Sequence, residues 1–400
     1  MSPSVQPVTH RHKLYKIIYT GAYTRFVFLH LLKFNIYKYR RVSSGTFYRK
    51  LAKYKNSVLY FDHSLGGGTA VYSDRRVKEL SKNHNVVVCQ YDGNIKRYIF
   101  SCNNDRICMV TADIDHRILE LFSHIIVNNL VGYKEPLGII ERIADAKNKN
   151  PALRVEFMVH DFFCICPGIH LFKPDLTSCV KNNRVNCIAC QSYPGFPSID
   201  TWRGAWEKFL VNTVNDITVF SESSRKILLS MYPSIEPKIK VVPHTVPSMR
   251  KVKIGKHENI NIGVVGNLNP IKGRAIVCDM AQMLPKNVNI VCIGLFSGVK
   301  PKNSRFICAG GYDLDDLPDI LEKHKIDIAL IPSVVPETFS FTTSECMNMG
   351  LPVACFDIGA PAERVSKYEY GLIISKIDAK IALKEILDFV NKIRNGSLNE

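Results

Sequence analysis

The chain has 400 residues, of which 46% are hydrophobic, and a formal net charge of +17. This length predicts two domains, and the apolar fraction is ample for two packed cores. The absence of any run of eighteen uncharged apolar residues excludes a membrane-spanning helix, and thirteen cysteines scattered through strand-like runs indicate thiols in a reducing compartment, which argues against a secreted disulfide framework.

The positive charge is concentrated in residues 1–55, which hold twelve Lys and Arg and no acid. The first carboxylate is Asp62, and the other 345 residues carry a net charge of only about +5. Basic residues mixed with Tyr, Phe, Leu and Ile predict an extension that lies on an anionic membrane surface. Nucleic acid is a rival partner, and a basic, partly helical cap packed on the first domain is the alternative without a partner. The apolar run at 26–33 lacks a cleavage site and does not indicate a secretory signal.

Residues 56–245 are predicted to form a Rossmann-like domain. A strand at 57–61 runs into a glycine-rich turn that includes Gly67 and Gly68, and a helix at 70–83 and a strand at 86–89 follow. This order is typical of the opening of such a domain, where glycines let the backbone approach a ligand. Further strands are expected at 124–127, 155–159 and 217–220.

A linker near 241–247, with two prolines, precedes a second Rossmann-like domain at 246–400. It opens with a strand at 260–265, a turn at 266–273 and a helix from residue 274. The remaining strands are expected at 288–293, 326–331 and 353–356, and a helix at 378–394. Two βαβ domains in sequence predict a cleft between them.

The segment 331–352 carries the most chemistry. Glu337 and Glu345 flank a turn that opens a helix after a buried strand. A helix N-terminus favours phosphate, whereas carboxylates accept hydrogen bonds from hydroxyls. A ligand with phosphate in its middle and hydroxyls at both ends is a nucleotide sugar. The alternative is an ordinary loop with two solvated glutamates.

The frame Pro-Glu-Thr-Phe-Ser around Glu337, the spacing to Glu345 and the following Gly-Leu-Pro-Val resemble the E-x7-E signature of glycosyltransferase family 4. That family belongs to the glycosyl transferases group 1 and contains retaining enzymes of the GT-B fold. The resemblance covers about 57–376. It implies that the first Glu contacts the donor sugar, that the second binds the ribose, and that the intervening backbone holds the phosphates. The backbone positions concerned are Phe339, Ser340, Phe341 and Thr342, and Ser340 stands where the family usually has Gly.

The turn Gly266-Asn-Leu-Asn-Pro-Ile-Lys272-Gly273 resembles the glycine loop with Lys-Gly of the same family. The resemblance implies that Lys272 neutralises the diphosphate of the leaving nucleotide without a metal. Asn267 stands where many relatives carry an Arg. By itself, Lys272 also fits a surface lysine beside a turn.

His160 and Asp161 follow a strand of the first domain and resemble the family's His-Asp pair, in which the His lies beside the donor sugar. The resemblance implies transfer with retention through an oxocarbenium-like ion pair, in which the departing phosphate takes the acceptor proton. No strong protein base is then needed, and Asp161 is not assigned as one. His160, Asp161 and Glu337 are the candidate catalytic residues, and a structural His at 160 is the alternative.

Cys166, Cys179, Cys187 and Cys190 are compatible with a structural zinc, with free thiols as the alternative. Two Asp-x-Asp strings, at 113–115 and 313–315, recur in manganese-dependent transferases of another fold. They are set aside because neither is expected after a strand beside a glycine-rich turn, and catalysis is expected to need no cofactor. The segment 357–364 resembles the family's loop after the last core strand, in which Glu363 and Arg364 are expected to pair.

The sequence therefore predicts an α/β protein of the GT-B fold, with two Rossmann-like domains facing each other across a cleft and a basic N-terminal extension. The predicted activity is retaining, metal-independent transfer of a hexose from a nucleotide-sugar donor to a glycan acceptor, lipid-linked, at the cytoplasmic face of the membrane. A nucleotide-sugar epimerase or phosphorylase of the same architecture is one alternative. A non-catalytic membrane or nucleic-acid adaptor is the other.

Overall fold

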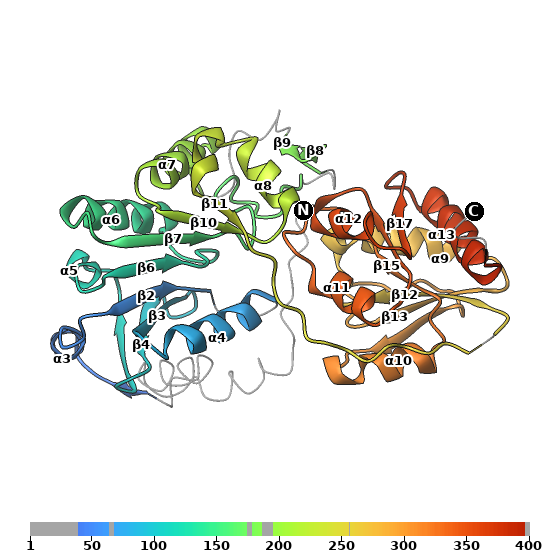
Figure 1. Cartoon of the computed structure of the whole chain (residues 1–400), viewed down its shortest axis with the longest axis horizontal. Coiled ribbons are helices and arrows are strands. Elements are labelled where there is room, and N and C mark those ends of the chain that lie inside the picture. Colours follow the sequence, from blue (N-terminus) through green and yellow to red (C-terminus); the bar gives the residue numbers. More distant parts are fainter. Residues whose placement is uncertain (1–38, 64–67, 174–177, 186–194, 256, 397–400) are drawn as a thin grey trace. The chain divides into compact units, whose positions relative to one another are not determined.

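The computed structural model describes residues 39–63, 68–173, 178–185, 195–255 and 257–396 (Figure 1). It divides into two compact units, Met1–Glu156 and Phe157–Glu400. Most of the predicted extension, together with Gly67, Cys187 and Cys190, lies outside the described residues. Among the described helices, none combines the length and the apolar character that crossing a membrane requires.

The first unit contains a mixed sheet with the strand order β1-β5-β4-β3-β2-β6. Parallel pairing joins β2 to both β3 and β6, whereas β4 runs antiparallel to β3 and β5. The strands are β1 (Arg40–Arg41), β2 (Ser57–Phe61), β3 (Asn85–Asp92), β4 (Arg97–Cys102), β5 (Ile107–Thr111) and β6 (His124–Val127). The helices are α3 (Ser44–Leu51), α4 (Gly68–Leu80), α5 (His116–Leu119) and α6 (Pro136–Lys149). The strand β7 (Arg154–Met158) crosses the limit between the units.

The described end of the basic extension is part of the first unit. The strand β1 pairs with β5, and Phe47 and Leu51 of α3 are buried. Ser43 caps α3 by accepting a hydrogen bond from the backbone N–H of Thr46. For this stretch the structure shows a packed cap.

The second unit begins with the end of β7 and continues through the parallel pair β10 (Asp216–Val219) and β11 (Ile239–Val241). The backbone N–H of Val159 donates to the carbonyl of Thr218, which places the end of β7 beside β10. A short hairpin is formed by β8 (Val180–Lys181) and β9 (Arg184–Val185). The helices of this part are α7 (Ile199–Asn212), α8 (Glu222–Leu229) and the 3-10 helix η2 (Pro233–Lys238).

The rest of the second unit is a parallel six-stranded sheet with the order β14-β13-β12-β15-β16-β17. Its strands are β12 (Ile260–Val265), β13 (Val288–Ile293), β14 (Phe306–Gly310), β15 (Ile328–Ile331), β16 (Val353–Phe356) and β17 (Gly371–Ile374). Its helices are α9 (Arg274–Gln282), α10 (Leu317–Lys323), α11 (Phe341–Asn348), α12 (Gly359–Val365) and α13 (Ala379–Arg394), with 3-10 turns η3 (Pro270–Lys272) and η4 (Leu314–Asp316).

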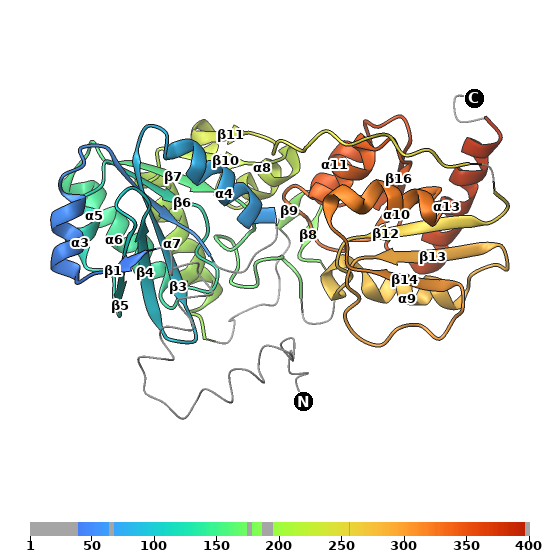
Figure 2. The same cartoon turned by 90° about the horizontal axis from the view of Figure 1, so that it is seen from below.

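Alternate residues of these strands enter two separate cores. Ile290 and Cys292 of β13 pack in a cluster with α9 and α13, whereas Val291 and Ile293 pack in a cluster with α10, α11 and α12. Helices thus cover both faces of the sheet, as Figure 2 shows, and both faces of the strands are apolar. In this doubly wound order successive strands are added on one side of β12 up to β14 and on the other side from β15 onward, so the strand order reverses between β12 and β15. Ligands of such sheets bind at the carboxyl ends of the strands at this point.

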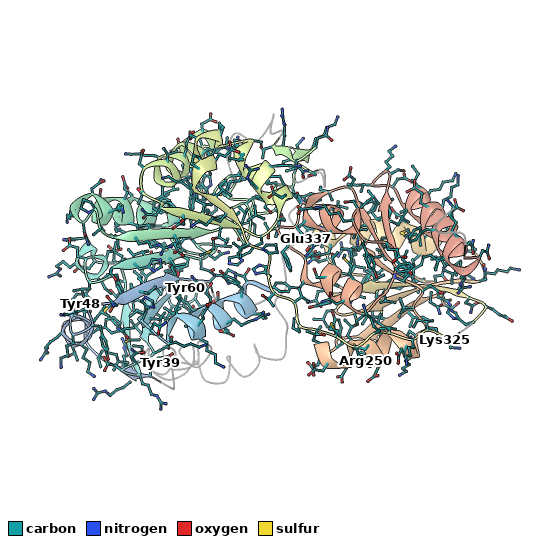
Figure 3. All side chains as sticks on the ribbon, viewed as in Figure 1. Tyr39, Tyr48, Tyr60, Arg250, Lys325 and Glu337 are labelled. Atoms are coloured by element: carbon teal, nitrogen blue, oxygen red, sulfur yellow. The ribbon has the colours of Figure 1, made fainter. Side chains whose placement is uncertain are left out.

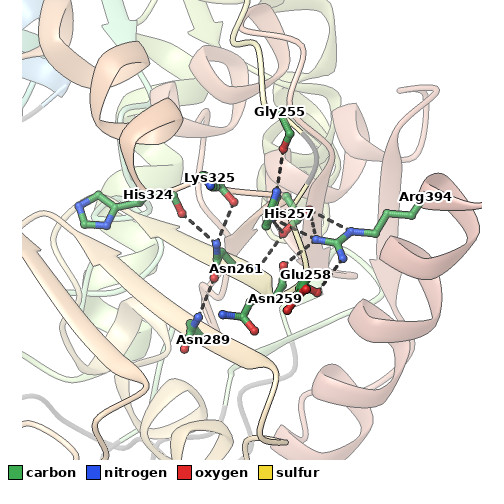
Figure 4. A network of polar contacts seen from close by, with 10 residues as sticks. Gly255, His257, Glu258, Asn259, Asn261, Asn289, His324, Lys325 and Arg394 are labelled. Carbon is green, nitrogen blue, oxygen red and sulfur yellow. Dashed lines mark hydrogen bonds and ion pairs between the residues drawn. The ribbon is translucent and has the colours of Figure 1, made fainter.

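A polar network that includes His257, Asn261 and Arg394 lies at the amino end of the same sheet (Figure 4). The guanidinium of Arg394, in the last turn of α13, donates to Asp327 Oδ1 at 2.8 Å and to the carbonyl of Asn259 at 2.6 Å. Asp327 Oδ2 accepts from the backbone N–H of Asn261 and lies 3.0 Å from Nε2 of His257. This network fastens the end of α13 to the sheet at the end opposite to the ligand side.

The segment that leads into the sheet is held on α10. Arg250, labelled in Figure 3, donates to Glu322 at 2.6 Å and pairs with Asp319. The backbone N–H of Val252 donates to the carbonyl of Met349. These contacts order the stretch between β11 and β12.

Candidate active site

Lys272 and Glu337 form an ion pair, with Nζ and Oε2 separated by 2.6 Å. Lys272 ends the turn after β12, and Glu337 lies in the turn after β15, so the pair sits at the point where the sheet order reverses. The two side chains are 38% and 11% exposed. Lys272 and Glu337, which the family resemblance assigns to one donor molecule, therefore meet at the carboxyl ends of two neighbouring strands.

The charge of Glu337 (Figure 3) is stabilised locally. Burial raises the pKa of this carboxyl, but the charge and hydrogen bond of Lys272 and hydrogen bonds from the hydroxyls of Ser333 and Ser340 outweigh burial and hold the pKa below its usual range. Glu337 is thus an ionised acceptor at neutral pH, which suits binding of hydroxyl groups.

The turn between Glu337 and α11 has a strained residue. Ser340 has a φ of 65°, in the left-handed region that favours glycine. Its hydroxyl bonds Glu337 and accepts from Thr343 Oγ1 at 3.0 Å, which offsets part of the strain. No side chain caps the first turn of α11, so the backbone N–H groups at Phe341 and Thr342 begin the helix beside this carboxylate.

Arg364 of α12 holds the turn between Glu337 and α11 through hydrogen bonds to its backbone. Its guanidinium donates to the carbonyls of Phe339 and Ser340 and to Ser344 Oγ, and it stacks 4.2 Å from the centre of the Phe339 ring. Burial lowers the pKa of Arg364 to about 10, so the group stays charged at neutral pH. The expected pairing with Glu363 stays a prediction: the charge of Glu363 raises the pKa of Arg364, and Glu363 also accepts from the backbone N–H of Ser223 at 2.7 Å.

Glu345 lies in the second turn of α11 and is 8% exposed. Burial raises its pKa, and no ion pair to Glu345 is found among the described residues. Burial, followed by the charges of Glu345 and Cys346, raises the pKa of the Tyr312 hydroxyl. Glu345 therefore points into a poorly solvated environment and is suited to accept hydrogen bonds from a ligand.

His160 and Asp161 follow β7 in the same unit. The backbone carbonyl of His160 accepts a hydrogen bond of 2.8 Å from Thr338 Oγ1, which is adjacent to Glu337. Asp161 accepts from the backbone N–H of Phe163 at 2.9 Å. The structure brings His160 to the Glu337 turn, and it shows Asp161 ordering the loop after β7.

The other predicted donor-binding residues have different roles in the fold. Gly266 has a φ of 102°, and Asn267 accepts from the backbone N–H of Leu295 at 3.0 Å, which ties the turn after β12 to the loop after β13. Gly68 is the first residue of α4 in the first unit. Of the cysteine set, Cys179 is buried and Cys166 accepts from the backbone N–H of Gly168.

The reason for setting aside the Asp-x-Asp strings is wrong for Asp313, but it holds for Asp113, which has no glycine-rich turn beside it. Asp113 follows β5 closely, and Asp313 comes three residues after β14, beside the Gly310-Gly311 pair. Neither strand was predicted from the sequence. Within the described residues, no group of three or more His, Cys, Asp or Glu side chains could hold a metal ion.

The comparison of the sequence with family models decides the class of protein. Residues 259–392, which contain Lys272, Glu337 and Glu345, match the family described as glycosyl transferases group 1. The protein is a glycosyltransferase. A comparison with curated proteins found no match.

Solved structures show that the glycosyltransferase has the GT-B fold. Anabaena Alr3699/HepE in complex with UDP-glucose is 14% identical with a TM-score of 0.55, over 86% of this chain and 91% of that chain. Sucrose-phosphate synthase from Thermosynechococcus elongatus gives the same identity and TM-score over 86% and 92% of the two chains. The apo form of the lipopolysaccharide outer core galactosyltransferase WaaB is 12% identical with a TM-score of 0.55, over 86% and 91%.

His170 of the glycosyltransferase was not predicted as a site residue. Burial lowers the pKa of this imidazole, the charge of Lys272 lowers it further, and the charge of Glu337 opposes both effects, so the ring lies within electrostatic range of the ion pair. Its neighbours Ile169 and Leu171 have φ values of 45° and 52°, and such outliers in β-branched and bulky residues cluster at functional sites. An isolated His between apolar residues gives no signal in the sequence.

Substitution of Ser340 tests the strain in this turn of the glycosyltransferase. Ser340→Ala keeps the left-handed φ and loses both hydroxyl contacts, whereas Ser340→Gly loses the contacts but removes the strain. We expect Ser340→Ala to be less stable than Ser340→Gly by about 1–2 kcal/mol, with the Gly variant within about 1 kcal/mol of the wild type. Denaturant unfolding of the three proteins measures this order, and equal stabilities of the two variants would contradict it.

Proposed function

We propose that the protein is a retaining, metal-independent glycosyltransferase of the E-x7-E type that transfers a hexose from a nucleotide-sugar donor to a glycan acceptor. The observation that carries the proposal is the Lys272–Glu337 pair beside the uncapped start of α11, at the point where the strand order reverses. An ammonium and a helix N-terminus suit a diphosphate, and two buried carboxylates suit the hydroxyls on either side of it.

In the proposed reaction, Lys272 and the backbone N–H groups at the start of α11 stabilise the negative charge that develops on the leaving diphosphate. Glu337 orients the sugar hydroxyls, Glu345 holds the ribose and His160 lies beside the sugar. Charge neutralisation by an ammonium supports a reaction without a divalent ion. The leaving phosphate takes the acceptor proton, so that the new bond forms on the face that the nucleotide left.

Relatives narrow the choice of donor and acceptor. The HepE structures hold UDP-glucose, or UDP and glucose, and WaaB is named as a lipopolysaccharide outer core galactosyltransferase. We therefore propose a UDP-hexose as the first donor to test and a lipid-linked saccharide at the cytoplasmic membrane face as the acceptor class.

The deciding experiment screens nucleotide sugars for thermal stabilisation, because a ligand that binds only the folded state raises the melting temperature. Transfer from the stabilising donor to lipid-linked saccharides is then measured, and the anomeric configuration of the product is read by NMR. Donor consumption without an acceptor would favour an epimerase or phosphorylase, and an inverted product would overturn retention. Loss of transfer on chelation, restored by manganese, would overturn metal independence.

Glu345→Gln tests the second carboxylate. The folded pKa of Glu345 is raised above 4.5, so its contribution to stability is present below about pH 4.5 and is lost as the pH rises through the folded pKa. We expect Glu345→Gln to melt at a higher temperature than the wild type at pH 7, with no gain at pH 4, and to bind the donor about 10–100-fold more weakly. The control is Glu369→Gln on an exposed glutamate. Wild-type donor affinity in Glu345→Gln would remove the residue from the site.

The proposal also assigns residues 1–55 to an anionic membrane surface. Cosedimentation with vesicles that contain anionic lipid measures this, with a variant in which Lys13, Lys16, Arg25 and Lys33 are replaced by Gln as the comparison. Equal binding of both proteins, or binding to nucleic acid in preference to vesicles, would overturn the assignment.

A structural zinc on Cys166, Cys179, Cys187 and Cys190 stays a prediction. Cys187 and Cys190 lie outside the described part of the chain. Metal analysis of the purified protein tests it, and less than about 0.2 equivalent of zinc per chain would count against a full site.

A further inference from the structure

His244, in the stretch that follows β11, packs against four other rings of the second unit. Its ring lies 3.8 Å from the ring of Phe220 at an interplanar angle of 18°, and 5.0 Å from the ring of Phe341 at 22°. It is also nearly parallel to His160, at 5.7 Å and 9°, and meets Phe339 edge-on at 4.8 Å and 90°. Such offset-stacked and edge-to-face pairs each contribute about 0.5–1.5 kcal/mol beyond the burial of their area.

The four rings come from three places in the sequence and form two groups. His160 follows β7 and Phe220 follows β10, and these two rings stack on each other at 4.6 Å. Phe339 and Phe341 belong to the turn between Glu337 and α11. His244 contacts both groups. Its ring therefore links the imidazole of His160 to the turn that leads into α11.

We propose that His244 is a positioning residue for transfer. Its flat ring keeps the rings of His160 and Phe341 in a fixed relative orientation at the donor site. The inference rests on the proposed function in that His160 lies beside the donor sugar. A hydrogen bond from Thr338 Oγ1 fixes the backbone carbonyl of His160, and the rings of Phe220 and His244 stack on its imidazole. Removing the ring of His244 leaves that backbone hydrogen bond in place but takes away a contact that helps to set the plane of the imidazole.

The kinetic test compares His244→Ala with His244→Phe. Since misplacement of a catalytic group by about 1 Å can cost about 10²-fold, we expect His244→Ala to lower kcat by about tenfold or more with the KM for the donor changed less than about threefold. His244→Phe, which restores a flat ring, should keep kcat within about threefold of the wild type. The control is Phe306→Ala, which removes a buried ring from the core beside α9 and should lower the melting temperature without lowering kcat.

A double variant shows whether His244 acts through His160. If it does, His160→Ala/His244→Ala should be no slower than His160→Ala alone, because coupled residues do not add. Multiplicative losses, a wild-type kcat in His244→Ala, or a His244→Phe variant as slow as His244→Ala would each overturn the inference.

A crystal structure of His244→Ala decides the inference without catalysis. The imidazole of His160 should tilt away from the ring of Phe220, and an unmoved imidazole would overturn the positioning role. Absence of transfer by the wild type with every donor would instead overturn the proposed function. The two failures are therefore distinguishable.

Discussion

Lys272→Met is expected to lower kcat for transfer by about 10²–10³-fold, the usual cost of removing one group that stabilises developing negative charge. The same substitution leaves the 11% exposed carboxylate of Glu337 without its counter-ion. Removing one partner of a buried pair costs about 3–5 kcal/mol, and because Lys272 is 38% exposed we expect about 2–3 kcal/mol here. Steady-state kinetics and denaturant unfolding measure the two effects.

The pH dependence of stability should change sign in this variant. In the wild type the pKa of Glu337 is lowered, so its contribution to stability is present above about pH 4.5 and is lost as the pH falls through the folded pKa. Without Lys272, burial becomes the dominant effect and raises that pKa. The destabilisation of Lys272→Met should then be smallest below about pH 4.5 and should grow as the pH rises through the raised pKa.

Two further variants separate charge from packing. Lys272→Met/Glu337→Gln should regain most of the lost stability, because no unpaired carboxylate remains, but it should regain no transfer. Lys286→Met, on an exposed lysine between α9 and β13, is the control and should be unchanged in both measurements. Full activity of Lys272→Met would falsify the role of the ammonium in leaving-group stabilisation.

The strands of the sheet that carries this pair could be predicted to the residue in several places. The predicted ranges 260–265, 288–293 and 353–356 coincide with β12, β13 and β16. Strands buried on both faces are short continuous apolar runs, and glycine or proline near their ends marks their limits.

The strands β4 and β5 of the first unit were missed. They pair antiparallel in a meander with β3, where the sequence analysis expected only alternating strands and helices. The signals for their turns are present, since Gly93-Asn94 follows β3 and Asn103-Asn104 follows β4, and Lys96 and Arg106 have positive φ in these turns. The apolar pattern of a single strand does not show whether its neighbour runs parallel or antiparallel, so a mixed sheet could not be predicted from it.

The candidate site could be predicted in part because its residues follow strands. Lys272 and Glu337 meet since β12 and β15 are neighbours in the doubly wound order. Their direct ion pair could not be predicted, because the distance depends on the shape of two turns. His170 and His244 could not be found either, since each reaches the site through contacts with residues far away in the sequence.

The shape of one of these turns depends on Gly273, and Gly273→Ala is expected to disrupt it. Gly273 has a φ of 75° and precedes α9, directly after Lys272. A Cβ at this position would overlap the carbonyl oxygen of Pro332 and lie 2.8 Å from its carbon, so backbone must move. We expect a loss of at least about 3 kcal/mol in the free energy of unfolding, since a steric clash adds to the cost of the left-handed φ.

Two glycines provide the matched comparison for this loss. Gly132 has a φ of 84° and open space around its Cβ position, so Gly132→Ala should cost only the conformational part, about 1–2 kcal/mol. Gly204 lies inside α7 with nothing near it, and Gly204→Ala should stabilise the protein by about 1 kcal/mol.

Because Gly273 connects Lys272 to α9 and packs against the residue that follows β15, its displacement should also separate Lys272 from Glu337 and weaken donor binding. A Gly273→Ala protein as stable as Gly132→Ala, with unchanged thermal stabilisation by the donor, would show that the turn can relax without moving the ion pair.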